Sequence, residues 1–308
     1  MRISRPFGVR TETKREIAKK YFLIFEGAET ENKYFFGINE NKEMLGINSL
    51  IEIVPILRSY NEQSWSNPQK ILNKLIEHIE LMNGKVPKVE NLCDMVIDWA
   101  YEKGIINENG LYTLETLKDE LQKNVVVDGG ICDKKKILKA AFDFLSQKLR
   151  VHNSIEQIEE YVNMQFVTYD ADYDKVCLIV DRDRKSFKEE QYDYVVRVCE
   201  EKRYNLYVSN PCFELWLLLH YDEVLQIDRE KLFTNPREKP KAKKRFIENQ
   251  LSRLMGGYKK NNLQFNKISD KVFNAIKNEE QFCEDVKDLK NELGCNLGLI
   301  IKEMMQKE

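Results

Sequence analysis

The chain has 308 residues, and its 49 lysines and arginines nearly balance its 51 aspartates and glutamates, for a formal net charge of -2. This balance excludes a uniformly basic coat protein for nucleic acid. Hydrophobic residues make up 42% of the chain and charged residues 32%, which excludes a disordered or collagen-like chain. At about 150 residues a domain, the length predicts two units or one domain with a large insertion, and the patterns along the chain favour the second.

The apolar runs are short and the cysteines are scattered. Runs such as Leu215–Leu219 are far below the roughly 18 apolar residues of a membrane-spanning helix. The basic start of the chain leads into charged residues rather than into the apolar core of a signal peptide. The cysteines have no zinc-ligand spacing; they are Cys93, Cys132, Cys177, Cys199, Cys212, Cys283 and Cys295. We therefore expect a cytoplasmic protein with reduced thiols.

Two strands and two helices are predicted before residue 84. Residues 21–25 form an apolar and aromatic run that ends at Glu26-Gly27, which predicts a buried strand. The acidic and then aromatic residues that follow predict a helix whose N-terminus faces the end of that strand. A second strand is predicted at 51–56, and Pro55 confines it to an edge or an end. Asn67-Pro68 predicts the N-cap and first turn of the next helix.

The strand pattern then stops and resumes about 90 residues later. The intervening residues are polar helical stretches interrupted by glycines. Val176–Val180 is fully apolar, which is typical of a strand in the middle of a sheet that is covered on both faces. A helix at 187–201, a short strand at 205–208 and a helix at 212–220 follow, and Ser209 or Asn210 is the predicted N-cap of that last helix.

These elements predict an α/β fold with a largely parallel sheet that helices flank. Residues 1–84 and 169–225 are the two parts of its core. Residues 85–168 are a predicted helical insertion, and residues 226–308 a basic loop followed by a helical C-terminal region.

Carboxylates follow two of the predicted strands. Glu26 ends the first strand, and Asp181 and Asp183 end the central one. Residues two apart on a strand project to the same side, and ligands collect at the carboxyl ends of parallel strands, so we expect the three side chains to converge. Close carboxylates repel one another without a cation. Oxygen ligands favour Mg²⁺ or Mn²⁺.

A Glu-Gly after one strand and an Asp-x-Asp after a later one resemble the Toprim domain of topoisomerases, primases and related nucleases. Three motifs in order, Phe25–Phe35, Leu178–Arg184 and Ser209–His220, resemble the RloB-like family, which comprises Toprim proteins of bacterial defence and abortive-infection loci. The resemblance covers roughly residues 18–60 and 170–300 and leaves the predicted insertion outside it.

This resemblance implies a Toprim-like fold and a metal-dependent nuclease that cuts DNA or RNA, tRNA included. It also implies an AAA-type or ABC-type ATPase as a partner encoded nearby. Carried over to this chain, Asp181 and Asp183 match the residues that hold Mg²⁺ or Mn²⁺. Glu26 matches the glutamate that either binds a second metal ion or acts as general base on the attacking water.

Glu214 is a further candidate for the catalytic site. It is the only charged residue from Pro211 to Leu219, and burial of a lone carboxylate costs several kcal/mol unless it is paired or metal-bound. Either it lies in the active site, or it is a capping-box partner of the preceding Ser209 or Asn210; the sequence leaves both open. We expect His220 to be structural.

Other charged residues lie close to the acidic motifs in the sequence. Of the acids after Gly27, we expect Glu29 to lie nearer the site than Glu31. Arg182 and Arg184 either pair with neighbouring carboxylates, contact a phosphate, or form exposed ion pairs.

A basic strip on a proline-containing loop is the strongest local concentration of charge. Its members are Arg237, Lys239, Lys241, Lys243, Lys244 and Arg245. Such a loop suits salt-sensitive contacts to nucleic-acid phosphates. The alternative is a loop that is simply solvated.

Other interpretations of the chain remain. In the first, it is a non-catalytic regulatory or nucleic-acid-binding subunit whose acids bind metal for structure. In the second, Asp-x-Asp is either the metal motif of a sugar-nucleotide transferase or the nucleophile of a phosphatase of the haloacid dehalogenase type, but neither enzyme accounts for Glu26-Gly27 or for Ser209–His220. Asp170–Asp174 does not fit a calcium loop, because Lys175 stands where such a loop needs glycine.

Overall fold

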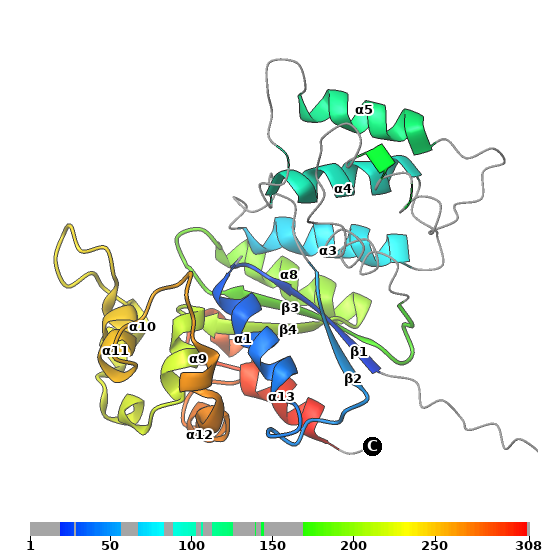
Figure 1. Ribbon diagram of the computed structural model, residues 1–308. Helices are drawn as coiled ribbons and strands as arrows, with labels where there is room; N and C mark the ends of the chain where they lie inside the picture. The colour runs from blue at the N-terminus through cyan, green and yellow to red at the C-terminus, as the bar shows by residue number, and fades with distance from the viewer. Residues whose placement is uncertain are drawn as a thin grey trace, which may run out of the picture.

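The computed structural model describes residues 19–27, 29–56, 67–82, 89–102, 106, 113–125, 139, 143–144 and 169–306. A five-stranded sheet in the order β2-β1-β3-β4-β5 forms its centre (Figure 1). The strands are β1 (Lys19–Phe25), β2 (Ile51–Pro55), β3 (Lys175–Asp181), β4 (Asn205–Asn210) and β5 (Gly294–Cys295). The first four are parallel, and only the short β5 runs antiparallel, beside β4. The predicted α/β fold with a largely parallel sheet is confirmed.

Helices cover both faces of this sheet. The α-helices of the core are α1 (Thr30–Glu40), α3 (Pro68–Met82), α8 (Glu189–Lys202), α9 (Phe213–Leu219), α10 (Arg229–Thr234), α11 (Phe246–Leu254), α12 (Val272–Glu279) and α13 (Leu297–Met305). Short 3₁₀ turns lie at Asp222–Gln226, Phe265–Lys267, Ser269–Lys271 and Asp288–Lys290. In Figure 1, α3 and α8 lie on one side of the sheet and α1, α9, α12 and α13 on the other.

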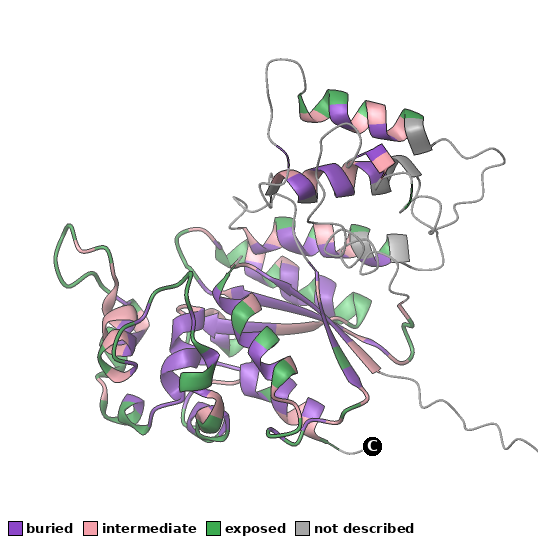
Figure 2. Cartoon of the chain, in the orientation of Figure 1, coloured by how far each residue is buried: buried purple, intermediate pink, exposed green. Residues whose placement is uncertain are grey.

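The alternation along β1 explains why its sequence is apolar throughout. Tyr21, Leu23 and Phe25 face the hydrophobic core under α1, α9, α12 and α13. Phe22 and Ile24 face the second core under α3 and α8. Both faces are therefore buried, as the purple strands in Figure 2 show, and a strand buried on both faces needs an uninterrupted apolar run.

The positions of the strands agree with their sequences. β2 is an edge strand, as the presence of Pro55 requires, because proline has no amide hydrogen for a neighbouring strand. β3 is central in the strand order and its apolar residues are buried. The Asn67 side chain accepts a 2.9 Å hydrogen bond from the Gln69 amide at the start of α3, which confirms the predicted N-cap.

The predicted cap of α9 is wrong. β4 continues to Asn210, and α9 begins at Phe213 with Cys212 in the N-cap position. Ser209 instead lies 3.3 Å from the Cys295 sulfur on β5, and the Asn210 side chain donates to the Leu289 carbonyl. Both side chains are engaged by the C-terminal region, which the local sequence could not reveal.

Two further helices, α4 (Val89–Glu102) and α5 (Leu114–Val125), fall within the predicted insertion. They pack on each other through a 2.7 Å ion pair between Lys118 and Asp98, and Gln122 donates a 2.9 Å hydrogen bond to Asp94. Most of residues 126–168 lie outside the described residues. The boundaries of the insertion stay a prediction.

The described part of the chain contains no disulfide, because all six of its cysteines are free thiols. Cys132 lies outside the described residues. Within the described ranges, no helix has the length and apolar character needed to cross a membrane.

Glu279 is an ionisable group buried in the core between α12 and α13. Its carboxyl group accepts a 2.9 Å hydrogen bond from the Gly298 amide, and a Cβ on Gly298 would lie 2.2 Å from the other carboxyl oxygen. Burial raises the pKa of Glu279 from 4.5 to about 8, although the bond from Gly298 opposes the shift. A side chain at 298 would therefore displace the carboxyl group from this position.

The raised pKa makes stability depend on pH. Because the folded protein holds this proton more tightly than the unfolded chain, the contribution is complete below pH 4.5 and is lost as the pH rises through about 8. We expect Glu279→Gln, which keeps the acceptor for Gly298 but cannot ionise, to flatten the fall in the urea midpoint between pH 5 and pH 9. The exposed Glu238→Gln is the control; identical profiles for wild type and Glu279→Gln would contradict this account.

Candidate active site

Glu26 and Asp181 meet at the carboxyl ends of β1 and β3. Glu26 follows directly after β1, and Asp181 is the last residue of the neighbouring β3. The Glu26 amide donates to the Ile179 carbonyl at 3.0 Å, and the Asp181 amide donates to Glu26 Oε2 at 2.9 Å. The structure therefore brings these two predicted site residues together and fixes the Glu26 carboxylate over the end of β3.

The Asp181 carboxylate contacts the start of α9. Its Oδ1 accepts a 2.7 Å hydrogen bond from the amide of Phe213, the first residue of that helix. The first amides of a helix have no partner within the helix and favour negative charge. Asp181 thus takes the place that the sequence assigned to Ser209 or Asn210.

Glu31, rather than Glu29, joins this group. Glu29 is exposed, whereas Glu31 is buried at the start of α1. Its carboxylate lies against Gly27, where an added Cβ would come within 2.2 Å of both carboxylate oxygens. The expectation that Glu29 is the nearer acid is wrong. Gly27 was the signal in the sequence that could have identified Glu31, because a residue without a side chain leaves room for the Glu31 carboxylate.

Glu214 completes the acidic cluster, by which we mean Glu26, Glu31, Asp181 and Glu214. Only 3% of Glu214 is exposed. Its Oε1 accepts a 3.0 Å hydrogen bond from the Tyr258 hydroxyl and forms a 2.9 Å ion pair with Lys260. Of the two alternatives, the capping box is wrong, and Glu214 lines the same cleft as Asp181; its catalytic role stays a prediction. Sequence reasoning missed Tyr258 and Lys260, because more than 40 residues separate them from Glu214.

The acids of this cluster influence one another. Burial raises the pKa of Asp181 well above its ordinary value, and the carboxylates of Glu26, Glu31 and Glu214 raise it further. Burial likewise raises the pKa of Glu31, and Glu214 adds to that shift. Lys260 opposes the shift of both groups, but its effect on the pKa of Asp181 is smaller than that of each neighbouring carboxylate.

A divalent cation suits this excess of negative charge. The donors are all carboxylate oxygens, the ligands that Mg²⁺ and Mn²⁺ prefer. Glu26 and Asp181 are the residues that would hold such an ion, since both lie at the strand ends where the charge is concentrated. Among the residues that the structure describes, no three acidic, histidine or cysteine side chains already stand in a metal-binding arrangement.

Asp183 lies apart from the acidic cluster. β3 ends at Asp181, so the alternation of side chains that predicted convergence stops there. Asp183 is exposed, and its Oδ1 accepts a 3.0 Å hydrogen bond from the Lys185 amide in the following turn. It lines the same cleft as Asp181 but does not contact Glu26 in the way that Asp181 does.

The two arginines beside Asp183 have different roles. Arg182 is 2% exposed, stacks on the Tyr192 ring at 5.3 Å and donates to the carbonyls of Phe187 and Lys290. Arg182 is therefore structural, and an exposed ion pair or a phosphate contact is excluded for it. Arg184 is exposed, lies 4.0 Å over the Phe233 ring and donates to the Asn291 carbonyl.

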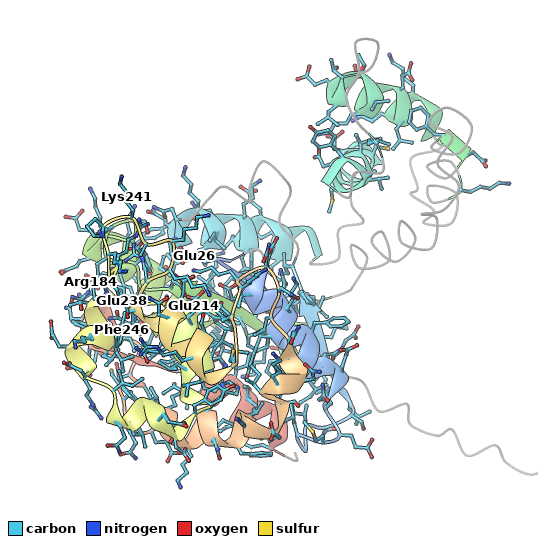
Figure 3. All side chains as sticks on the ribbon, turned by 60° about the vertical axis from the view of Figure 1, so that its left-hand side comes forward. Glu26, Arg184, Glu214, Glu238, Lys241 and Phe246 are labelled. Carbon is cyan, nitrogen blue, oxygen red and sulfur yellow. The ribbon has the colours of Figure 1, made fainter. Side chains whose placement is uncertain are left out.

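A cleft of about 470 Å³ opens over the strand ends. β3, the β4-α9 connection, α10 and α11 contribute to it, and its lining includes Asp181, Asp183, Arg184, Lys185, Glu214, Phe233, Arg245 and Lys260. Figure 3 labels Glu26, Glu214 and Arg184 in this region, below the loop that carries Lys241. Acidic and basic side chains thus line the same cleft.

The basic strip divides into two parts. Arg237, Lys239, Lys241 and Lys243 are exposed, and within the described chain they form no ion pair or hydrogen bond through their side chains. Lys244 instead donates to the Ser252 hydroxyl at 2.6 Å and to the Tyr258 carbonyl at 2.7 Å. Arg245 stands at the N-cap of α11 and is partly buried. Only the first four are free to contact a phosphate backbone.

His220 has the structural role that we expected. It is completely buried, and its Nδ1 lies 3.0 Å from the Trp216 carbonyl, to which it must donate. Its Nε2 then accepts from the Tyr34 hydroxyl at 3.2 Å. Burial lowers the pKa of His220 to about 4, so the ring is neutral at physiological pH.

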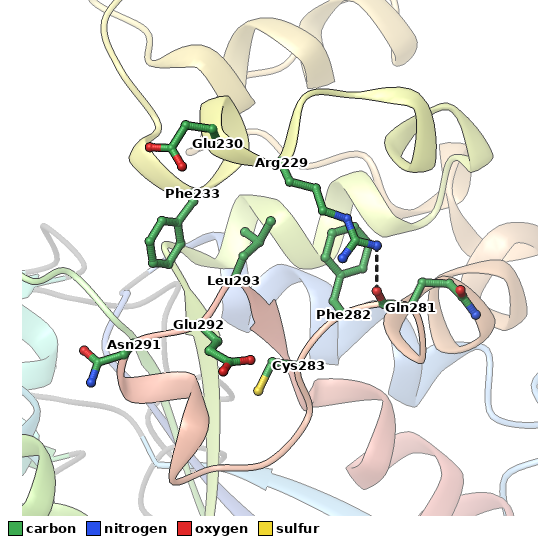
Figure 4. Close-up of a pocket in the computed structure, with 9 residues that line it drawn as sticks. All are labelled: Arg229, Glu230, Phe233, Gln281, Phe282, Cys283, Asn291, Glu292 and Leu293. Atoms are coloured by element: carbon green, nitrogen blue, oxygen red, sulfur yellow. Dashed lines mark hydrogen bonds between the residues drawn. The ribbon is translucent and has the colours of Figure 1, made fainter.

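A second cleft of about 470 Å³ adjoins the first and shares Glu230 and Phe233 with it (Figure 4). Arg229 crosses it, donating to the Gln281 carbonyl at 2.9 Å and stacking on Phe282 at 4.8 Å. Sequence reasoning did not predict this cleft, because its residues come from α10 and from residues 281–283 and 291–293, which are distant in the sequence.

Fold and site together define an α/β protein with carboxylates at the carboxyl edge of a mostly parallel sheet. The family model described as RloB-like protein matches residues 21–304. The chain therefore belongs to the RloB-like family, and the match includes the stretch predicted as an insertion. No curated protein and no solved structure was found to match the chain.

The division of the basic strip can be tested through stability. Lys244→Met removes one hydrogen bond to Ser252 on α11 and one to the Tyr258 carbonyl, and each such bond is worth about 1 kcal/mol. We expect a loss of about 1–2 kcal/mol in the free energy of unfolding, measured by urea denaturation. The matched control Lys243→Met, at an exposed side chain, should leave it unchanged; equal losses would contradict the division.

Proposed function

We propose that this protein is a metal-dependent nuclease that hydrolyses phosphodiester bonds of DNA or RNA, tRNA included. We further propose that it acts in the cytoplasm as the effector of a bacterial antiphage or abortive-infection system, together with an AAA-type or ABC-type ATPase. The observation that carries the proposal is the hydrogen bond from the Asp181 amide to Glu26 Oε2, which joins the two acidic motifs beside the cleft that Asp181 lines. Membership in the RloB-like family supports it.

In this proposal, Glu26 and Asp181 hold Mg²⁺ or Mn²⁺. A bound divalent ion lowers the pKa of a water molecule and offsets charge on the phosphate oxygens. If Asp181 holds the ion without Glu26, Glu26 is instead suited to accept the proton of the attacking water, because its carboxylate is fixed over the strand end rather than free in solution. Asp183, at the rim of the same cleft, remains a proposed ligand that contributes from the solvent side.

Exposed cations would bring the nucleic acid to this cleft. Arg184 and Lys185 line it, and the four free members of the basic strip lie on the loop between α10 and α11. Contacts of this kind recognise the phosphate backbone and not the base sequence. They account for substrate binding by a chain whose overall charge is close to zero.

The main alternative is a non-catalytic regulatory or nucleic-acid-binding subunit. It is favoured by the exposed position of Asp183 and by the lack of a ready-made metal site of three side chains among the described residues. In that case the acidic cluster would serve stability alone, and the basic loop would be the functional surface.

Substitutions that preserve hydrogen bonding distinguish the two functions. Glu26→Gln and Asp181→Asn keep the acceptors for the Asp181 and Phe213 amides but remove negative charge. We expect each to lower Mg²⁺-dependent or Mn²⁺-dependent cleavage by on the order of 10²-fold or more, measured on labelled DNA and RNA with and without the ATPase.

Asp183→Asn should lower cleavage less than either of these variants, because Asp183 stands at the rim. The exposed Glu189→Gln on α8 is the control and should cleave like the wild type. Undiminished cleavage by both Glu26→Gln and Asp181→Asn would refute the catalytic assignment. Wild-type protein that binds nucleic acid but never cleaves it would favour the alternative.

The basic loop gives a second prediction. Replacement of Arg237, Lys239, Lys241 and Lys243 by glutamine should weaken nucleic-acid binding and flatten its dependence on salt, by about 0.7–0.9 in slope for each phosphate that the loop no longer neutralises. Fluorescence anisotropy over a range of NaCl concentrations measures both. Lys277→Gln on α12, also exposed, should change neither; an unchanged slope in the fourfold variant would show that the loop is only solvated.

A further inference from the structure

The second cleft, shown in Figure 4, continues the first one. Glu230 and Phe233 line both clefts. Arg184 lines the first cleft, and its guanidinium carbon lies 4.0 Å from the centre of the Phe233 ring. The same guanidinium donates a 2.8 Å hydrogen bond to the carbonyl of Asn291, which lines the second cleft. Phe233 therefore stands where the two clefts meet, and a strand-like ligand that passes Arg184 in the first cleft can reach the second.

Each cleft contains an arginine that is stacked on a phenylalanine and bonded to a backbone carbonyl. Arg229 in the second cleft repeats the arrangement of Arg184. Its guanidinium carbon lies 4.8 Å from the centre of the Phe282 ring, and it donates a 2.9 Å hydrogen bond to the Gln281 carbonyl. Both arginines are exposed, and within the described ranges neither is paired with a carboxylate. A guanidinium that is held in one plane offers a surface on which a nucleobase can stack.

The second cleft combines flat apolar walls with polar groups beside them. In Figure 4, Phe233 and Phe282 lie on opposite sides of Leu293. The lining also includes Asn291 and Glu292, whose amide and carboxylate groups can form hydrogen bonds with the edge of a base. The volume of about 470 Å³ falls in the range of roughly 300–1,000 Å³ that small-molecule sites occupy. These features match the flat faces and polar edge of a nucleobase.

The charges of the second cleft favour the base of a nucleotide over its phosphate. Of the described residues that line it, Arg229 is basic, whereas Glu230 and Glu292 are acidic. Such a balance repels a phosphate group but not an uncharged base. Arg184 and Lys185 line the first cleft instead, which is where the phosphate of the same nucleotide would lie.

We propose that the second cleft receives one unpaired base of a nucleic-acid strand, which stacks against the Phe233 ring and the Arg229 guanidinium while the backbone passes Arg184 into the first cleft. A base inside a duplex must leave the stack before it can enter such a cleft. The substrate is therefore single-stranded nucleic acid or an unpaired segment of a folded one. This inference rests on the proposed function of the first cleft and names its substrate class.

Binding without a metal ion tests this inference apart from cleavage. Fluorescence anisotropy of the full chain in EDTA compares a labelled single strand, the same strand with abasic sites at its centre, and a paired duplex. We expect the wild type to bind the intact strand at least about fivefold more tightly than the abasic strand. Phe233→Leu keeps an apolar side chain without a ring, and Arg229→Lys keeps the charge without the flat guanidinium. Each should lower this ratio, and the double variant should bring it to one.

The matched control is Arg253→Lys, at an exposed arginine on α11 that lines neither cleft, and it should keep the ratio of the wild type. All of these variants should bind the duplex like the wild type, because a paired base does not enter the cleft. The same measurements on DNA and on RNA should agree, since both kinds of strand carry bases that can stack.

Equal affinity of the wild type for the intact and abasic strands would overturn the inference, as would an unchanged ratio in the double variant. Binding of a free nucleoside monophosphate that the double variant loses, without any preference for the intact strand, would assign the cleft to a small nucleotide instead. Cleavage is read separately. A preference for the intact strand without cleavage in Mg²⁺ or Mn²⁺ would refute the nuclease and leave this inference standing, whereas cleavage without that preference would refute the inference alone.

Discussion

The structure depends on the hydrogen bonds of two half-buried carboxylates where β1 and β3 end. Glu26 accepts the amide of Asp181, and Asp181 in turn accepts the amide of Phe213. Each carboxylate therefore satisfies a backbone amide that would otherwise lack a partner at the edge of the sheet or at a helix start. These bonds join β1, β3 and α9 at one point, and the rest of the site is arranged around the negative charge collected there.

The compensating groups come from the C-terminal region. Tyr258 and Lys260 reach Glu214, and Lys244 holds the Tyr258 carbonyl from the end of the basic loop. A buried carboxylate is tolerated only where hydrogen bonds or opposite charge replace the lost water. The C-terminal region is thus a structural part of the site and not an appendage to the sheet.

The same region also determines the shape of the cleft. α10 and α11 form one wall, and Arg184 from the turn after β3 lies on Phe233 of α10. Free cations remain on the outer loop, whereas Lys244 and Arg245 are engaged inside it. The net charge of -2 is therefore an average over a cleft that acidic and basic side chains line together and a loop that carries four exposed cations.

By itself, the sequence determined the elements whose pattern is local. The apolar runs of β1 and β3 identified strands buried on both faces, Pro55 identified an edge, and Asn67-Pro68 a helix start, because backbone chemistry and burial periodicity act over a few residues. The three ordered motifs likewise identified the family.

Only the tertiary structure decided which charged groups meet. Asp183 leaves the cluster because β3 ends two residues earlier, Glu31 enters it because Gly27 makes room, and Lys260 joins Glu214 across 46 positions of the chain. Asp181, rather than Ser209 or Asn210, accepts the first amide of α9. Ser209 and Asn210 instead contact β5 and the turn at Asp288–Lys290. The physical reason is that charge balance and capping at this edge are settled by segments distant in sequence, whose contacts leave no periodic trace in the local pattern of residues.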